Sequence, residues 1–180
     1  GVRLVGSEMC IRDSDRGTYM HNYHRVYGKL LGPDRYKIRN VLEVGIWTGL
    51  GLLTWANYFP NSMVEGVDKL FQWETKIKRL FEQDGSYRIN LNWADTTNEE
   101  VLRLHFPPKK YDTYFDVIFD DGNHFASGQM ATLINCWQYL KPGGWYFIED
   151  LTEKFEPSNK LLEYIDTLAE EGHEIGWFHY

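Results

Sequence analysis

The feature that most constrains the fold is a regular alternation of strand-like and helix-like segments. Apolar runs typical of strands occupy residues 40–46, 62–68, 87–95, 114–121 and 145–150, and helical patterns occupy 51–59, 73–84, 98–105, 125–140 and 158–171. This alternation predicts a doubly wound α/β fold, in which a mainly parallel sheet carries helices on both faces.

The segments around this core give weaker signals. Helical spacing over residues 19–31 predicts one more helix before the first strand, and the stretch from 173 to 180 resembles the start of a further strand. PPKK at 107–110 is expected to be a loop, and KPGG at 141–144 is expected to end the preceding helix.

The first residues do not fit this pattern. LVGSEMCIRDS, residues 4–14, has no helical or strand period and matches a transposon-based sequencing adapter translated in frame. We therefore expect residues 1–13 to be a non-native leader, with a genuine disordered leader as the alternative. Residues 14–180 are expected to form a single domain, as a metagenomic fragment cut at both ends.

Charge and composition exclude several classes of partner. The net charge is -7 and no basic stripe is visible, which argues against nucleic-acid binding. No apolar run approaches the roughly 20 residues that span a bilayer. The two cysteines form no CxxC pair, so neither a zinc site nor a disulfide framework is supported. We expect a cytoplasmic protein.

A glycine-containing loop follows the first expected strand. VLEVGIWTGLG, residues 41–51, places Glu43 two residues before Gly45, and Gly49 opens the next helix. In a doubly wound sheet, ligands lie beyond the carboxyl ends of the strands, where glycine allows close approach to the backbone. The loop lacks the GxGxxG pattern of dinucleotide sites. A plain strand-to-helix turn remains the alternative.

Acidic residues also end the next two strands. Asp68 follows the glycines by about 20 residues, where a carboxylate can accept the two hydroxyls of a ribose. Asp95 ends the third strand. An isolated acid at a strand end is common, so these residues gain meaning only from their order and spacing.

A second group of ionisable residues follows the last two expected strands. DVIFDDGNHF places Asp120, Asp121 and His124 after one strand, and Glu149 with Asp150 ends the next. Carboxylates brought together repel unless a cation or protons intervene, and oxygen ligands favour Mg2+. The alternatives are helix capping by Asp120 or Asp121, a solvated loop for His124, and exposed strand-end acids for the pair.

The pattern ExGxxxGxG resembles motif I of class I S-adenosylmethionine-dependent methyltransferases, whose fold is Rossmann-like. This resemblance covers residues 15–180 and implies that Glu43, Gly45 and Gly49 surround the amino acid and ribose of the cofactor. It further implies that Asp68 binds the ribose and that Asp95 binds the adenine amino group. Trp47 departs from the family, because many members carry a glycine at that position.

The second acidic group is similar to a narrower subgroup, the macrolide-sugar O-methyltransferases and the cephalosporin-hydroxylase-like proteins. The resemblance implies that Asp121, Glu149 and Asp150 hold Mg2+ and that His124 is the catalytic base, with Asp121 also catalytic. It implies that Asp120 faces the cofactor or a helix N-terminus. The early His21, Tyr23 and Tyr27 match a motif expected to contact cofactor or substrate.

These observations predict an S-adenosylmethionine-dependent, Mg2+-assisted O-methyltransferase. Its expected acceptor is a hydroxyl of a sugar or another polyhydroxylated small molecule. The alternatives are a cofactor-binding domain without methyl transfer, hydroxylase-like chemistry on the same fold, and a nicotinamide-dependent oxidoreductase. The sequence is compatible with a homo-oligomer and does not decide the oligomeric state.

Overall fold

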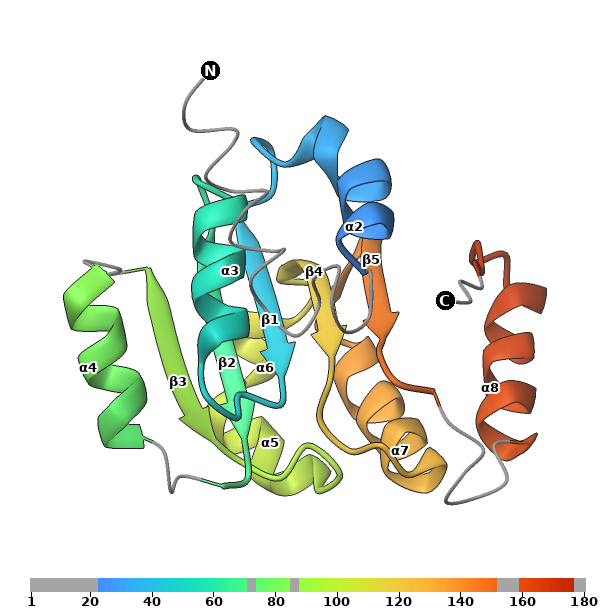
Figure 1. The fold of residues 1–180 in the computed structure, drawn as a ribbon. Helices are drawn as coiled ribbons and strands as arrows, with labels where there is room; N and C mark the ends of the chain where they lie inside the picture. The colour runs from blue at the N-terminus through green and yellow to red at the C-terminus, as the bar shows by residue number, and fades with distance from the viewer. Residues whose placement is uncertain (1–22, 71–73, 85–87, 152–158, 177–180) are drawn as a thin grey trace.

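The strands of the structure form one parallel sheet. A computed structural model describes residues 23–70, 74–84, 88–151 and 159–176. Within these residues, five strands lie in the order β3-β2-β1-β4-β5 (Figure 1). Their bounds are β1 Asn40–Val44, β2 Met63–Asp68, β3 Ile89–Trp93, β4 Phe115–Asp120 and β5 Leu140–Ile148. All neighbouring pairs are parallel, so every carboxyl end reaches the same edge.

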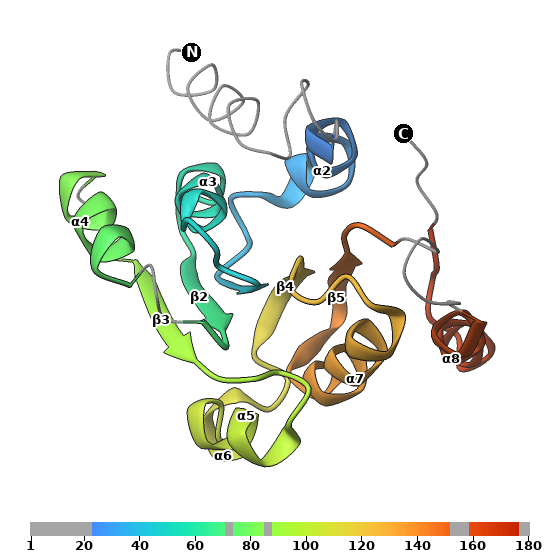
Figure 2. The same cartoon turned by 60° about the horizontal axis from the view of Figure 1, so that its bottom comes forward.

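Helices cover both faces of this sheet (Figure 2). On one face lie α2 (Tyr23–Leu31), α3 (Leu50–Tyr58) and α4 (Glu74–Asp84); on the other lie α5 (Glu99–His105), α6 (Pro108–Tyr111) and α7 (Ala126–Trp137). The short helix η1 spans Gly32–Asp34, and α8 (Asn159–Glu170) packs against α7. The predicted doubly wound α/β class is therefore confirmed.

Each face of the sheet has its own apolar core. Toward α2 and α3, the Trp55 indole stacks on Phe119 with ring centroids 3.8 Å apart. Toward α5, α6 and α7, a separate cluster includes Leu102, Phe106 and Cys136, all fully buried. Strands covered on both faces are apolar almost throughout, as buried parallel strands are. Among the described residues, no helix combines the length and apolar character needed to span a bilayer.

Three local expectations were wrong. Residues 108–111 form α6, with Pro108 in its first turn, where the missing amide hydrogen of proline costs nothing. Residues 141–144 belong to β5, and a register shift between Phe115 and Val117 accommodates them. Residues 173–176 form no strand. The remainder of that expected strand and the start of the first expected helix lie outside the described residues.

Polar residues in β3 have a partner inside the fold. Glu65 of β2 is 4% exposed, and its carboxylate accepts hydrogen bonds from Asn90 Nδ2 at 3.1 Å and from Asn92 Nδ2 at 3.0 Å. The hydroxyl of Tyr111 in α6 donates to the same carboxylate at 3.3 Å. The two asparagines therefore join β3 to β2 through side chains as well as through the sheet.

Replacing Glu65 with alanine should destabilise the protein by about 2–4 kcal/mol, because three donors lose a buried acceptor and a cavity remains. Glu65→Gln keeps the size of the side chain and one acceptor oxygen, so its loss should be less than half as large. Urea unfolding measures both values. Equal losses in the two variants would contradict a role as shared acceptor.

Candidate active site

A cavity of about 480 Å3 opens at the carboxyl edge of the sheet. The residues that line it come from the end of every strand and from the start of α3: 43–48, 50–51, 67–70, 94–97, 121–124 and 150. β1 lies between β2 and β4, so the chain continues to one side of β1 in β2 and β3 and to the other side in β4 and β5. Ligands of doubly wound folds bind at the carboxyl ends of the strands beside such a reversal of strand order. The glycine loop therefore shares one cavity with three members of the second acidic group, Asp121, His124 and Asp150.

Glycine is required at position 45 by a close backbone approach. Gly45 has a φ of +86°, and a Cβ built there would lie 2.2 Å from the carbonyl oxygen of Asp121. The amide of Gly45 donates to Val67 O at 2.9 Å, and the amide of Asp121 donates to Val44 O at 3.0 Å. The glycine loop is thus packed directly against the turn that carries Asp121 and His124.

The other glycine of the motif serves the helix. Gly49 is the N-cap of α3, with a φ of +80°, and a Cβ there would lie 2.9 Å from Ile77 Cγ2. Gly49 is buried and does not line the cavity, although the sequence places it among cofactor-binding residues. Its part in the site is to let α3 begin beside the loop.

Trp47 and Asp68 form one side of the cavity. Trp47 has a φ of +42°, unusual for a bulky side chain, and is 66% exposed. Asp68 Oδ2 accepts from the amides of Ile46 at 2.8 Å and Trp47 at 3.3 Å, and Oδ1 accepts from Leu70 at 2.8 Å. Asp68 therefore fixes the glycine loop while it lines the cavity.

Two predicted cofactor-binding acids differ in their placement. Glu43 is 1% exposed and lines the cavity, and Trp55 Nε1 donates to its Oε1 at 3.1 Å. Asp120 is also 1% exposed but lies behind the cavity wall, where its carboxylate accepts from Tyr146 and from Gly122, each at 3.4 Å. Of the two expected placements of Asp120, toward the cofactor or toward a helix N-terminus, the first is not met, because Asp120 does not line the cavity.

Burial raises the pKa of Asp120 from 3.8 to about 7. Between these values the unfolded chain has released this proton and the folded chain retains it, so stability falls as pH rises. We expect the free energy of unfolding of the wild type, measured in EDTA, to fall relative to Asp120→Asn by up to about 1.4 kcal/mol per pH unit across this window. Parallel pH profiles of the two proteins would contradict a neutral buried Asp120.

The turn after β3 supplies the next part of the cavity. Asp95 Oδ1 accepts from Thr97 Oγ1 at 2.7 Å and from the Thr97 amide at 3.0 Å, and the hydroxyl contact lowers the pKa of Asp95. Ala94, Thr96 and Thr97 line the cavity with it. Sequence reasoning missed both threonines; the only available signal was their position directly after an expected strand.

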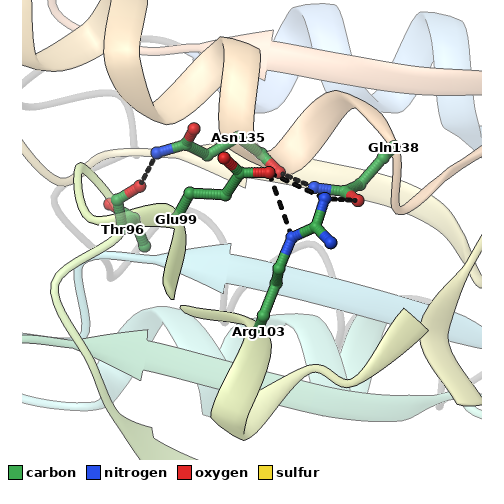
Figure 3. Close-up of polar contacts among 5 residues, drawn as sticks. All are labelled: Thr96, Glu99, Arg103, Asn135 and Gln138. Atoms are coloured by element: carbon green, nitrogen blue, oxygen red, sulfur yellow. Dashed lines mark hydrogen bonds and ion pairs between the residues drawn. The ribbon is translucent and has the colours of Figure 1, made fainter. Parts of the chain in front are cut away.

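Hydrogen bonds from α7 hold this turn in place (Figure 3). Asn135 Nδ2 donates to Thr96 O at 2.8 Å, and Gln138 Nε2 donates to Asn135 O at 2.9 Å. Arg103 of α5 binds Glu99 and reaches Gln138 Oε1 at 3.4 Å. The hydroxyls of Thr96 and Thr132 lie 2.9 Å apart and are buried. Contacts from α7 therefore fix the Thr96 backbone and hydroxyl in this wall of the cavity.

Three ionisable residues meet at the opposite side of the cavity. Asp121, His124 and Asp150 each offer one ligand atom, and these atoms all lie within 4.8 Å of one another. All three residues line the cavity. The structure thus brings together two of the three expected metal ligands and the expected base.

Glu149, the third expected ligand, lies outside this group. It is 3% exposed, and its Oε1 accepts a hydrogen bond of 2.5 Å from the hydroxyl of Tyr27. Tyr27 therefore contacts the pair of Glu149 and Asp150 through Glu149, but Tyr27 does not line the cavity. Its expected companions, His21 and the Tyr23 side chain, lie outside the described residues.

The donor set of the group fits a small hard cation. Two carboxylates this close repel each other unless a positive charge lies between them. Carboxylate oxygens are the ligands that Mg2+ prefers, and Mg2+ commonly uses only one or two of them. Asp121 and Asp150 would supply these ligands, which leaves the exposed imidazole of His124 for proton transfer.

Comparison with known proteins agrees with this architecture. A family model described as a methyltransferase domain matches residues 42–151. L-olivosyl-oleandolide 3-O-methyltransferase of Streptomyces antibioticus is 28% identical over 152 residues, which are 81% of this chain and 36% of the relative. Mycinamicin VI 2''-O-methyltransferase of Micromonospora griseorubida is 25% identical over 147 residues, 77% of this chain and 34% of the relative. The chain spans about a third of the length of these relatives.

Solved structures share the fold. A methyltransferase from the mycinamycin biosynthetic pathway, in complex with Mg and SAH, aligns with a TM-score of 0.62 at 22% identity, covering 86% of this chain and 38% of that one. An SAH-bound methyltransferase of Podospora anserina aligns with a TM-score of 0.62 at 15% identity, covering 96% of this chain and 80% of that one.

Proposed function

Because this chain belongs to the family of methyltransferase domains, we propose that it transfers the methyl group of S-adenosylmethionine to a hydroxyl of a sugar or similar polyhydroxylated molecule, assisted by Mg2+. One observation carries the proposal. The glycine loop and the group of Asp121, His124 and Asp150 line the same cavity, so a nucleoside donor and an activated hydroxyl can meet there.

The nucleoside half of the cavity would be formed by the loop and the next two strand ends. Gly45 allows close approach to the loop backbone. Asp68 would accept one ribose hydroxyl, since a carboxylate has about four acceptor positions and three backbone amides use the others. Asp95, fixed by Thr97, would accept from the adenine amino group. The held geometry reduces the entropy lost on binding.

The acceptor half would use the acidic group. A divalent cation held by Asp121 and Asp150 would supply a positive charge that lowers the pKa of a neighbouring hydroxyl. The imidazole of His124 would take the hydroxyl proton as the oxygen attacks the methyl carbon. The bond from this carbon to sulfur breaks, its electron pair stays on sulfur, and S-adenosylhomocysteine leaves, while Asp121 would stabilise the imidazolium. Alignment of oxygen, carbon and sulfur across one cavity supplies much of the rate.

The named relatives support the choice of acceptor. L-olivosyl-oleandolide 3-O-methyltransferase and mycinamicin VI 2''-O-methyltransferase are both named for transfer of a methyl group to oxygen, and the first name includes an L-olivosyl sugar. The solved structure from the mycinamycin pathway contains Mg and SAH. These properties belong to those proteins, and their combination with the cavity described above favours the same class of reaction for this chain.

Calorimetry tests the donor assignment. S-adenosylhomocysteine, the demethylated donor, should bind with a Kd on the order of micromolar, which corresponds to a binding free energy of about -8 kcal/mol. NADH should not bind. NADH binding in place of S-adenosylhomocysteine would favour a nicotinamide oxidoreductase and contradict the proposal.

Methyl transfer from labelled donor to a panel of glycosides tests the reaction itself. Transfer should require a divalent cation and stop in excess EDTA. Nucleoside binding without transfer to any glycoside would indicate a binding domain, and transfer that persists in EDTA would remove the cation from the mechanism.

A further inference from the structure

Asp150 holds an unusual backbone conformation. Its φ is +53°, in the left-handed region that L side chains seldom adopt. Such a residue persists where its surroundings determine the conformation, and it is common at functional sites. Asp150 is also a member of the group that lines the cavity with Asp121 and His124. The contacts of the residue before it, Glu149, therefore bear on how this conformation is stabilised.

The preceding residue, Glu149, is fixed at three points. Its amide donates to Asp120 O at 2.9 Å, which extends the pairing of β5 with β4. Its carbonyl oxygen accepts from Gln129 Nε2 of α7 at 3.0 Å. Its side-chain Oε1 accepts from Tyr27 of α2 at 2.5 Å. These contacts come from the sheet and from both faces of it.

The two side-chain donors are themselves buried. Gln129 is 2% exposed and Tyr27 is 3% exposed. The Tyr27 ring makes edge contacts with Trp55, Phe119 and Phe147, with centroids 5.4, 5.1 and 5.0 Å away. A ring held on three sides places its hydroxyl at one position, so it fixes the Glu149 carboxylate at one position as well.

We propose that Tyr27 and Gln129 are positioning residues that act through Glu149 on Asp150. By holding Glu149 from α2 and α7, they impose the left-handed turn that directs the Asp150 carboxylate toward Asp121 and His124. Neither side chain lines the cavity. The inference rests on the proposed function, since it concerns the cation that Asp121 and Asp150 would bind.

The test measures cation affinity directly, with Mn2+ as the probe and the free ion followed by electron paramagnetic resonance. Tyr27→Phe removes one oxygen atom and should weaken Mn2+ binding about 10-fold. This is the lower end of the loss for direct partners of metal ligands, because Tyr27 acts on Asp150 only through Glu149. Gln129→Met removes the other donor at similar size and should act in the same direction. It provides an independent variant should Tyr27→Phe fail to fold.

Tyr111→Phe is the matched control. Tyr111 is also a buried tyrosine whose hydroxyl donates to a buried glutamate, Glu65, but on α6 and outside the cavity lining. It should lower stability by a similar amount and leave Mn2+ affinity unchanged. An equal loss of Mn2+ affinity in both tyrosine variants would show that any loss of stability weakens Mn2+ binding. That result would overturn the inference.

A double-mutant cycle tests whether Tyr27 affects Mn2+ binding through Asp150 or only through the stability of the fold. In the Asp150→Asn background, adding Tyr27→Phe should change Mn2+ affinity by less than about 3-fold, because the ligand on which Tyr27 acts is already gone. A full additional loss would overturn the inference. So would unchanged or tighter binding in Tyr27→Phe alone, the result expected if release of Glu149 adds a ligand.

The Mn2+ titrations distinguish loss of the cation site from loss of the positioning role alone. If the wild type binds no Mn2+, the cation is lost from the proposed function and the inference falls with it. If the wild type binds Mn2+ and Tyr27→Phe binds it equally well, only the positioning role is overturned.

Discussion

Alanine at position 45 is expected to destabilise the protein by about 2–6 kcal/mol and to abolish binding of S-adenosylhomocysteine. An L residue with a φ of +86° costs about 1–3 kcal/mol. The added Cβ would also lie 2.2 Å from the backbone of Asp121, and overpacking of this kind costs about 1–3 kcal/mol more. Because the contact is with backbone, relief requires that the glycine loop and the 121–122 turn move apart. Urea unfolding and calorimetry measure the two effects.

Gly143→Ala isolates the conformational part of this effect. Gly143 has a φ of +76°, and no atom lies within 4 Å of a Cβ built there. Its variant should lose about 1–2 kcal/mol and bind S-adenosylhomocysteine as the wild type does. Normal nucleoside binding by a folded Gly45→Ala variant would contradict the close packing of the two segments.

Asp121→Asn is expected to weaken binding of a divalent cation at least about 100-fold, because it removes the charge of a proposed direct ligand. Loss of an outer partner alone costs about 10–100-fold. The amide keeps the size of the side chain, so the fold and the nucleoside half of the cavity should remain intact. A Mn2+ titration measures the loss, and calorimetry with S-adenosylhomocysteine checks that the cavity is retained.

A change of charge far from the cavity provides the control. Asp166 lies exposed on α8, and Asp166→Asn removes the same unit of charge without touching the cavity. It should leave Mn2+ affinity within about 2-fold, since solvent and salt screen distant charges. Equal losses in the two variants would show that the general negative field of the protein, rather than a site at Asp121, attracts the ion.

The strands and helices of the sheet were predictable because their signals are local. Buried parallel strands such as Phe115–Asp120 are apolar on both faces, and the acids at their ends stand out. All carboxyl ends of a parallel sheet meet at one edge, so the meeting of Gly45 with Asp121 and Asp150 followed from order alone.

The direction of individual side chains was not predictable, because it depends on long-range contacts. Asp120 and Asp121 are adjacent, yet one is buried behind the cavity and the other lines it. Glu149 and Asp150 likewise separate: Glu149 binds Tyr27, which lies 122 positions earlier in the chain, and Asp150 adopts a left-handed turn. No local pattern encodes either contact.

The polar interruptions of β3 illustrate the same limit. Asn90 and Asn92 weaken a strand pattern when read alone, because asparagine is depleted in strands. Their buried partner, Glu65, lies on the neighbouring strand, 25 and 27 positions away from them. The reason for asparagine at these two positions becomes clear only once β3 is known to pair with β2.

Crystals grown with S-adenosylhomocysteine and Mn2+, and measured at the manganese absorption edge, would locate both ligands in one experiment. We expect one anomalous peak bonded to carboxylate oxygens of Asp121 and Asp150, with the nucleoside lying between the glycine loop and Asp95 in the same cavity. A nucleoside bound elsewhere, or an occupied nucleoside cleft with no manganese at those two carboxylates, would contradict it.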